Sequence, residues 1–208
     1  MSVSFTQIIQ DFDKADCPFK LFKNWLELAK QTEPKDHNAF SLATVNQEGQ
    51  PNVRILLLKE YNHEYFIFYT NFESTKGQEL LTNKKAAMGF YWKSLERQIR
   101  IRGIIDVVSD AKADSYFASR PYLSKIGARV SQQSKILPSR QYFEDKLLKE
   151  QKKYPNDKVP RPDYWSGFCL KPLSIEFWQA EPSRLHDRII FNREDTNSNL
   201  WQKHRLYP

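Results

Sequence analysis

Five short segments rich in aromatic and β-branched residues lie between residues 39 and 108, and they constrain the possible fold more than any other feature. They are Ala39–Val45, Asn52–Lys59, Tyr65–Thr70, Ala86–Trp92 and Gln98–Val108. The first two are joined by turn-forming residues at positions 46–51, a pattern typical of a hairpin. Short strands that follow one another through tight turns predict an antiparallel sheet or barrel.

The rest of the chain predicts a few helices and a return to strands at the C-terminal end. The expected helices cover residues 19–29, Thr75–Asn83, Asp110–Ser119 and Arg140–Lys153. The expected late strands are Ser174–Gln179, Arg184–Phe191 and Trp201–Leu206. The sequence therefore predicts a single domain, residues 1–208, of α+β class with mainly β structure.

Composition places the chain among ordinary globular proteins and gives it a basic surface. Hydrophobic residues make up 40% of the 208 residues, charged residues make up 27%, and the formal net charge is +7. Such a surface attracts anions, which include nucleic acid, membrane headgroups and phosphorylated small molecules. Because the cations are scattered among acids and no apolar run approaches the length of a membrane span, we expect neither nucleic acid nor membrane as a partner.

The expected location of the protein is the cytoplasm. The first segment, Met1–Phe12, is mixed and contains an acid, unlike a signal or transit peptide. Cys17 and Cys169 lie far apart and form neither a CxxC pair nor a metal-ligand spacing. Two such cysteines are typical of reduced thiols in a cytosolic protein.

The first candidate site is the segment Arg184-Leu185-His186-Asp187-Arg188. Alternate residues of a strand share a face, so Arg184, His186 and Arg188 are expected to point the same way. Three potential cations side by side repel one another unless an anionic or electron-rich group lies over them. A solvated basic edge strand is the alternative, since charges at sheet edges block aggregation.

A second candidate combines Tyr116, Arg120 and Ser124. The first two are four residues apart on a predicted helix and lie on one face, while Pro121 ends that helix and Ser124 follows within the turn. A phenol, a guanidinium and a hydroxyl at a helix end suit a phosphate. The alternative is an ordinary surface pair of tyrosine and arginine.

Three further features are weaker. Thr75 and Gln78 have capping-box spacing, and Lys76 adds a charge at a helix start that favours an anion, although a plain capped helix fits equally. Arg54 and Lys59 lie on opposite faces of a regular strand, so both could serve one site only if a bulge or a strand end re-aims one of them. Gln98 could offer its amide to a heterocycle or simply face solvent.

The familiar nucleotide, metal and nucleophile motifs are missing from the sequence. It contains no GxGxxG motif, no P-loop, no zinc-ligand spacing and no evident nucleophilic triad. With only six glycines, the chain would hold phosphates by side chains and helix starts. These features alone describe a basic α+β protein with several possible anion sites.

Motifs spread along nearly the whole chain resemble the pyridoxamine 5'-phosphate oxidase family. They are Arg54-Ile55-Leu56-Leu57-Leu58-Lys59, Phe68-Tyr69-Thr70-Asn71, Leu95-Glu96-Arg97-Gln98, Tyr116-Phe117-Ala118-Ser119-Arg120-Pro121, Ser124-Lys125-Ile126-Gly127-Ala128, Ser131-Gln132-Gln133-Ser134, Ile175-Glu176-Phe177-Trp178-Gln179 and Arg184-Leu185-His186-Asp187-Arg188. Each motif is modest, but the ordered set with its spacings, from about residue 19 to residue 208, is highly specific.

This resemblance implies an FMN-binding split β-barrel with flanking helices and a homodimer with FMN at its interface. Residues 36–125 would form the FMN-binding part and residues 165–208 the C-terminal dimerisation part. The implied reaction is oxidation of pyridoxamine or pyridoxine 5'-phosphate to pyridoxal 5'-phosphate, with O2 reduced to hydrogen peroxide.

The resemblance also implies roles for individual residues. The implied FMN contacts are Arg54, Ile55, Leu56, Leu57, Leu58, Lys59, Tyr69, Thr70, Thr75, Lys76, Gln98, Gln133, Ser134, Trp178 and Arg188, with Arg54 and Lys76 on the FMN phosphate. The implied clamp on the substrate phosphate is Lys59, Tyr116, Arg120 and Ser124. Arg184, Leu185 and His186 would lie beside the pyridine ring, with Arg184 and His186 as catalytic residues. No metal is implied.

Thr75 departs from the family pattern, which often has an arginine at that position. Two other function classes stay open: a related flavin enzyme with another substrate, such as the phenazine-pathway oxidases, and a non-enzymatic basic protein that binds nucleic acid. The complete phosphate clamp disfavours the first class, and the scattered cations disfavour the second. A yellow colour after purification would separate the flavoproteins from the nucleic-acid binder.

Overall fold

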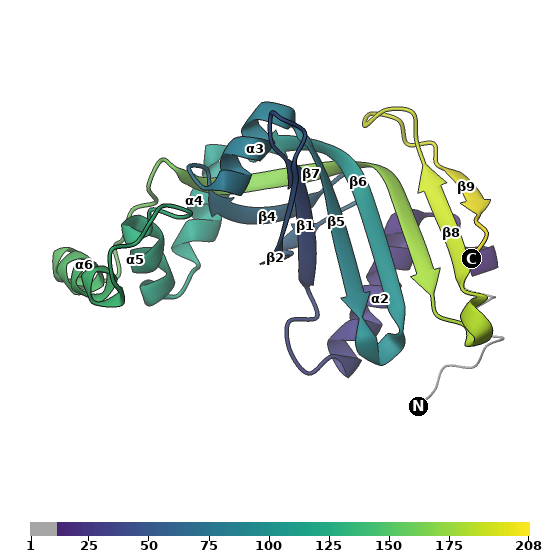
Figure 1. The fold of residues 1–208 in the computed structure, drawn as a ribbon, viewed down its shortest axis with the longest axis horizontal. Helices are drawn as coiled ribbons and strands as arrows, with labels where there is room; N and C mark the ends of the chain where they lie inside the picture. Colours follow the sequence, from purple (N-terminus) through teal and green to yellow (C-terminus); the bar gives the residue numbers. More distant parts are fainter. Residues whose placement is uncertain (1–11) are drawn as a thin grey trace.

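The computed structural model describes residues 12–208, so the segment that precedes Phe12 lies outside the described residues. Within residues 12–208, nine strands form one curled antiparallel sheet with helices on its flanks (Figure 1). The strands are β1 (Ala39–Val45), β2 (Pro51–Leu57), β3 (Glu60–Tyr61), β4 (Phe66–Asn71), β5 (Lys85–Trp92), β6 (Arg97–Val107), β7 (Trp165–Gln179), β8 (Asp187–Asn192) and β9 (Gln202–Arg205). The α-helices are α2 (Pro18–Thr32), α3 (Thr75–Asn83), α4 (Asp110–Ala118), α5 (Tyr122–Val130) and α6 (Arg140–Lys153).

The longest strand, β7, joins the two parts of the sheet. The strand order is β2-β1-β5-β6-β7-β4-β3, and β8 and β9 extend the sheet from the far half of β7. β7 therefore pairs with β4 through its first residues, with β8 through its last residues, and with β6 along nearly its whole length. Because β7 has a different neighbour at each end, the sheet can curl and divide into two parts while β7 stays hydrogen-bonded along its length.

A bulge between β6 and β7 explains how a proline fits inside the sheet. The register shifts between Arg102 and Gly103, which face Ser174 and Pro172. Proline has no backbone N–H to give to a partner strand, and a bulge is one of the few sheet positions that tolerates it. A Cβ on Gly103 would lie 2.1 Å from the carbonyl oxygen of Lys171, so the close crossing requires glycine.

The main core lies between α2 and the sheet. The ring of Phe22 packs 4.9 Å from that of Phe66 and 5.4 Å from that of Phe90, and Trp25 packs edge-on at 5.3 Å from Phe177. Aromatic residues at this spacing bury large apolar areas and account for the high aromatic content. The core thus fixes the sheet against which the candidate site is built.

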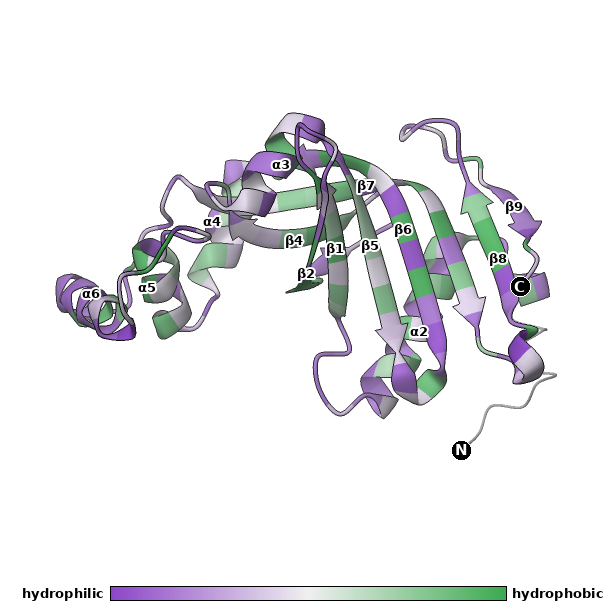
Figure 2. Cartoon of the chain, in the orientation of Figure 1, coloured by the Kyte–Doolittle hydropathy of each residue, from purple (hydrophilic) through white to green (hydrophobic). Residues whose placement is uncertain are grey.

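Helices α5 and α6 project from one side of the sheet (Figure 1). α6 has no buried residue, and Figure 2 shows it as mainly hydrophilic along its length. No helix within residues 12–208 has the length and apolar character needed to cross a membrane.

The expected fold class is confirmed, and most expected elements are confirmed to within one or two residues. The expectations for residues around Ser124, Trp165 and Thr75 are wrong. Residues 122–130 form the helix α5, so Ser124 lies on a helix and not in a turn. β7 begins at Trp165 instead of Ser174. The helix cap of α3 is Ser74, whose side chain accepts from the N–H of Gly77, and not Thr75.

Candidate active site

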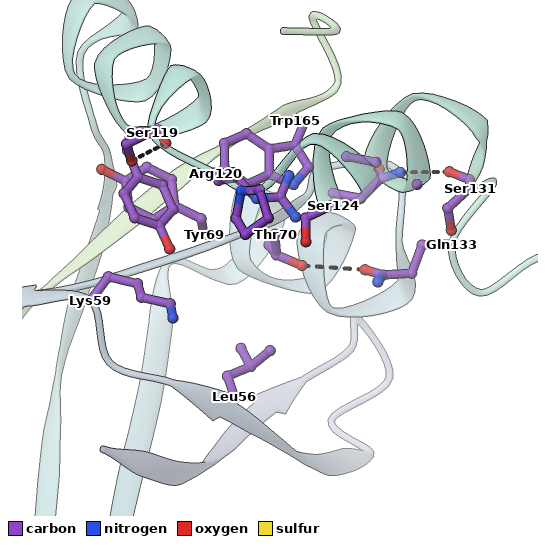
Figure 3. Close-up of a pocket in the computed structure, with 15 residues that line it drawn as sticks. Leu56, Lys59, Tyr69, Thr70, Ser119, Arg120, Ser124, Ser131, Gln133 and Trp165 are labelled. Carbon is purple, nitrogen blue, oxygen red and sulfur yellow. Dashed lines mark hydrogen bonds between the residues drawn. The ribbon is translucent and has the colours of Figure 1, made fainter. Parts of the chain in front are cut away.

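A cavity of about 570 Å³ opens where β4, α4, α5 and the end of β2 meet (Figure 3). We call it the Arg120 pocket. Its lining is Leu56, Lys59, Tyr69, Thr70, Asn71, Tyr116, Ser119, Arg120, Pro121, Ser124, Gly127, Ala128, Ser131, Gln133 and Trp165. The structure therefore brings Lys59, Tyr116, Arg120 and Ser124 into one cavity, although Lys59 lies far in sequence from the other three.

The corner between α4 and α5 places Arg120 and Ser124 beside each other. α4 ends at Ala118, and α5 begins directly after Pro121, with the N–H of Ser124 donating to the Pro121 carbonyl at 2.9 Å. Lys125 is buried beneath this corner, where its Nζ donates to the Ala118 carbonyl and pairs with Asp157 at 2.7 Å. These contacts hold the end of one helix against the start of the next.

Arg120 is a partly buried cation whose surroundings are aromatic. Its guanidinium carbon lies 4.6 Å from the ring centroid of Trp165 and 5.5 Å from that of Phe117. Its Nη1 is buried and has no hydrogen-bond partner among residues 12–208. Burial lowers the pKa of Arg120, and the nearby Tyr116 opposes that shift. A buried guanidinium with an unused donor is a favourable site for an anion.

Three aromatic rings form one wall of the Arg120 pocket. Tyr69 and Tyr116 stack with centroids 4.0 Å apart, and Tyr69 stacks on Trp165 at 5.4 Å with an interplanar angle of 8°. Room for Tyr69 comes from Gly167 on the paired strand, where a Cβ would lie 2.8 Å from the tyrosine ring. The stack fixes the direction in which both phenols point.

Beside the pocket lies a second cation, Lys76, at the start of α3. Its Nζ donates to Gln133 Oε1 at 2.8 Å, to Ser74 Oγ at 3.3 Å and to Thr70 Oγ1 at 3.4 Å, and all three acceptors are neutral. Burial lowers the pKa of Lys76, and the positive charge of Arg54 lowers it further. We call Lys76, Thr70, Ser74 and Gln133 the Lys76 cluster.

Neighbours on the loop and on β2 complete this cluster. The backbone N–H of Thr75 donates to Ser134 Oγ at 3.3 Å, so Ser134 lies over the start of α3. Arg54 Nη2 lies 3.3 Å from Glu79 Oε2, and its Nη1 donates to Thr44 Oγ1 and to the Leu42 carbonyl. Two cations therefore lie near the start of α3.

β2 is an edge strand, and its end explains how Lys59 reaches the pocket. β2 ends at Leu57, so Lys59 lies beyond the regular strand and does not follow its alternation. Along this run Ile55 is exposed and Leu58 is buried in the core. Of the apolar residues expected at the cofactor, only Leu56 lines the pocket.

The remaining expected residues lie elsewhere in the chain. Gln98 pairs with Trp178, and Trp178 pairs with Arg188, so the three side chains form a row across β6, β7 and β8. We call this the Trp178 row. Arg188 donates to Glu176 Oε1 through Nη2 at 2.7 Å, and the Trp178 ring lies 4.6 Å from that of His186.

The expectation that Arg184, His186 and Arg188 share a strand face is wrong. β8 begins only at Asp187, and Arg184 lies in the short 3-10 turn η2 (Pro182–Arg184). Ser183 and Arg184 have φ values of 56° and 61°, which turn the chain sharply before the strand. Leu185 and His186 line a separate cavity of about 770 Å³ near the C-terminus, and His186 Nδ1 accepts the N–H of Glu181 at 3.2 Å.

Among residues 12–208, no hydrogen bond, ion pair or ring contact joins the Trp178 row to the Arg120 pocket or to the Lys76 cluster. Figure 1 shows β8 and α5 on opposite sides of the molecule. The sequence interpretation also missed Trp165, because the start of β7 was not predicted.

Comparison with known families gives two matches that together span most of the chain. A model described as pyridoxamine 5'-phosphate oxidase matches residues 27–153. A second model, described as the pyridoxine 5'-phosphate oxidase C-terminal dimerisation region, matches residues 165–208.

Individual relatives agree with these matches. A pyridoxine/pyridoxamine 5'-phosphate oxidase of Chelativorans sp. (strain BNC1) is 55% identical, with 95% of this chain and 94% of the relative covered. One of Brucella anthropi is 52% identical, with 98% and 100% covered. PhzG from Burkholderia lata, solved with tetrahydrophenazine-1-carboxylic acid, has a TM-score of 0.89 and 27% identity, with 100% and 99% covered. The chain is an enzyme, and it belongs to the pyridoxine/pyridoxamine 5'-phosphate oxidase family.

Proposed function

We propose that the protein oxidises pyridoxine 5'-phosphate and pyridoxamine 5'-phosphate to pyridoxal 5'-phosphate, with FMN as cofactor and O2 as electron acceptor. The alcohol and O2 give the aldehyde and hydrogen peroxide, and with the amine a water also enters and ammonia leaves. The observation that carries this proposal is the buried, unused Nη1 of Arg120 in one pocket with Lys59, Tyr116 and Ser124. Incubation with pyridoxine 5'-phosphate and FMN tests it, and aldehyde and peroxide should form in equal amounts.

The residues around Lys76 fit the phosphate of FMN. No carboxylate lies within ion-pair distance of Lys76 among the described residues, and its hydrogen-bond partners are neutral oxygens. Arg54 adds a second cation, and the start of a helix favours an anion. Lys76 and Arg54 would hold the phosphate, with further contacts from Ile55, Leu56, Leu57, Leu58, Lys59, Tyr69, Thr70, Thr75, Gln133 and Ser134. When bound, FMN would supply the two-electron redox chemistry.

The chain's own residues would then fix the substrate. Arg120, with Lys59, Tyr116 and Ser124, would bind the phosphate end, so orientation is set before hydride leaves the substrate. Arg184, Leu185 and His186 would lie beside the pyridine ring. Because His186 Nδ1 accepts an N–H, the neutral ring carries its proton on Nε2, where it can donate to a substrate oxygen.

A second copy of the chain would complete the site. The Trp178 row and His186 lie apart from the Arg120 pocket within one chain, yet the proposed reaction needs both. In a closed two-fold dimer, residues 165–208 of one protomer, with Gln98 on the neighbouring strand β6, would bring this row to the FMN-binding part of its partner, within residues 36–125. The description of the second family match, a dimerisation region, supports this arrangement.

The dimer prediction can be tested by mixing two inactive variants. Arg120→Ala disables the pocket, and Arg188→Ala disables the row, so each homodimer should be nearly inactive at low substrate concentration. In a statistical mixture half of the dimers are mixed, and each mixed dimer has one intact site, which restores about a quarter of wild-type activity. Co-expression of the two variants measures this. A monomeric mass with FMN still tightly bound, or mixed dimers without activity, would contradict the prediction.

Thr75→Arg is expected to tighten FMN binding. Thr75 is exposed at the start of α3, where an arginine has room to turn toward the phosphate held by Lys76. One charge-assisted contact contributes about 1.5–3 kcal/mol at best. Titration of apo-protein with FMN at several salt concentrations measures the change. Thr82→Arg, in the last turn of the same helix, is the matched control and should leave the affinity unaltered. Weaker binding in Thr75→Arg would mean that Thr75 is not near the phosphate.

A second candidate substrate class follows from the similarity to PhzG. That protein was solved with a phenazine precursor that carries a carboxylate and no phosphate. The cations of the Arg120 pocket favour a doubly charged phosphate over a single carboxylate. Parallel assays with pyridoxine 5'-phosphate and with the phenazine precursor distinguish the two, and we expect turnover of the phosphorylated substrate.

A further inference from the structure

We propose that Trp165 is a positioning residue of the Arg120 pocket. Its indole ring holds the Arg120 guanidinium in place, and thereby sets the affinity of the pocket for the substrate phosphate. This inference rests on the proposed function, because it takes Arg120 as the main ligand of that phosphate.

The geometry around Trp165 is layered. Trp165 is the first residue of β7 and is only 6% exposed. Its ring lies 6.2 Å from that of Tyr116 with an interplanar angle of 9°, and the guanidinium carbon of Arg120 lies 4.6 Å from its centroid. One buried side chain therefore lies directly beside Arg120 (Figure 3), and Tyr116 is the third ring of the stack that Trp165 and Tyr69 begin.

An aromatic face orients an arginine in a way that a carboxylate cannot. The N–H donors of a guanidinium lie in its plane, so a ring that stacks on the flat face uses none of them. A carboxylate partner would occupy the same donors that a phosphate needs. Arg120 forms no ion pair among the described residues, and its Nη1 is left unused. Contact with the Trp165 ring thus holds the cation without occupying its donors, and Nη1 stays available.

Trp165 is itself held firmly against the helix that carries its partners. Its backbone N–H donates to the Pro162 carbonyl at 2.9 Å, and its backbone carbonyl accepts from Arg161 Nη1 at 2.9 Å. Arg161 also pairs with Asp110 at 2.8 Å and Asp114 at 2.6 Å, both on α4. Because α4 also carries Tyr116 and leads into Arg120, this network fixes the ring relative to both.

Two substitutions at Trp165 distinguish the effect of its aromatic ring from the effect of its volume. Trp165→Leu removes the aromatic face, and we expect the Michaelis constant for pyridoxine 5'-phosphate to rise roughly tenfold, which corresponds to about 1.4 kcal/mol. Trp165→Phe keeps a flat ring and should restore most of the affinity. Trp165 also stacks on Tyr69, a proposed FMN contact, so the substitutions could weaken FMN binding. Assays at saturating FMN remove that effect from the Michaelis constant. Turnover of unphosphorylated pyridoxine should change little in either variant.

Trp92→Leu is the matched control, since Trp92 is equally buried but packs in the main core against Phe90. It should lower the melting temperature without changing the Michaelis constant. Because Trp165 acts through Arg120, adding Trp165→Leu to Arg120→Ala should raise the constant by no more than about twofold.

Two outcomes would overturn the inference, and they differ in what else they affect. If Trp165→Leu leaves the Michaelis constant unchanged, as Trp92→Leu does, while Arg120→Ala raises it, then the proposed role of Trp165 is wrong and the proposed phosphate site is retained. If Arg120→Ala itself leaves the constant unaltered, the proposed phosphate site and the role of Trp165 both fail.

Discussion

Replacing Arg120 with alanine is expected to raise the Michaelis constant for pyridoxine 5'-phosphate about a hundredfold, which corresponds to about 2.8 kcal/mol. The planar guanidinium can hold two phosphate oxygens at once, and the remaining pocket ligands, Lys59, Tyr116 and Ser124, cannot copy that geometry. Turnover should also fall, since a loosely held phosphate lets the reacting carbon move away from its position. Steady-state kinetics at saturating FMN measures both constants.

Three controls define what this result means. FMN content should stay near normal in Arg120→Ala, because the FMN phosphate is proposed to lie on Arg54 and Lys76. Unphosphorylated pyridoxine should be a poor substrate for the wild type and hardly worse for the variant. Arg140→Ala removes an exposed arginine of α6 that pairs with Glu144 and should change nothing. If Arg120→Ala loses its flavin and keeps its Michaelis constant, the two phosphate sites have been exchanged.

Lys76→Met is expected to weaken FMN binding about a hundredfold or more, as expected when a buried charge partner is removed. The substitution keeps the length of the side chain and removes its charge. Without FMN the melting temperature should not fall, because a buried cation with neutral partners adds little stability. Quenching of flavin fluorescence during titration measures the affinity. Lys152→Met, on the exposed surface of α6, serves as the control.

The same lysine predicts a pH dependence. Burial and Arg54 lower the pKa of Lys76, so the empty site loses its proton at a lower pH than an ordinary lysine would. Since the protonated form binds the phosphate, FMN affinity should fall as the pH rises through that lowered pKa. The dependence should disappear in Lys76→Met. An equal loss of affinity at alkaline pH in both proteins would show that another group is responsible.

Much of the fold could be predicted because local signals and tertiary structure agree. Ala39–Val45, Thr75–Asn83 and Arg140–Lys153 have the bounds expected from periodicity and turn residues. The strand expected at Ser174–Gln179 in fact begins at Trp165, and the bulge opposite Gly103 explains how β7 continues through Pro172. Pro121 was interpreted as the end of one helix, and it is also the residue that caps the next.

The candidate site could be predicted in composition but not in arrangement. Lys59, Tyr116, Arg120 and Ser124 do meet in one cavity, yet nothing local reveals that Trp165 lies beneath Arg120 from a distant strand. The alternation around His186 predicted a strand that begins too early. Ser183 and Arg184 have positive φ angles that turn the chain, and without a glycine at either position the sequence does not indicate such a turn.

The shared strand β7 has a consequence for the order in which the protein is made. β4 and β6 both leave the ribosome long before Trp165–Gln179, and each must wait for that segment as its neighbour. Until then the nascent chain exposes two unpaired strand edges with many apolar side chains, which are prone to join other chains. Sheet closure over such a long sequence separation is slow. The late synthesis of one strand therefore leaves both edges open to other chains until synthesis has passed Gln179.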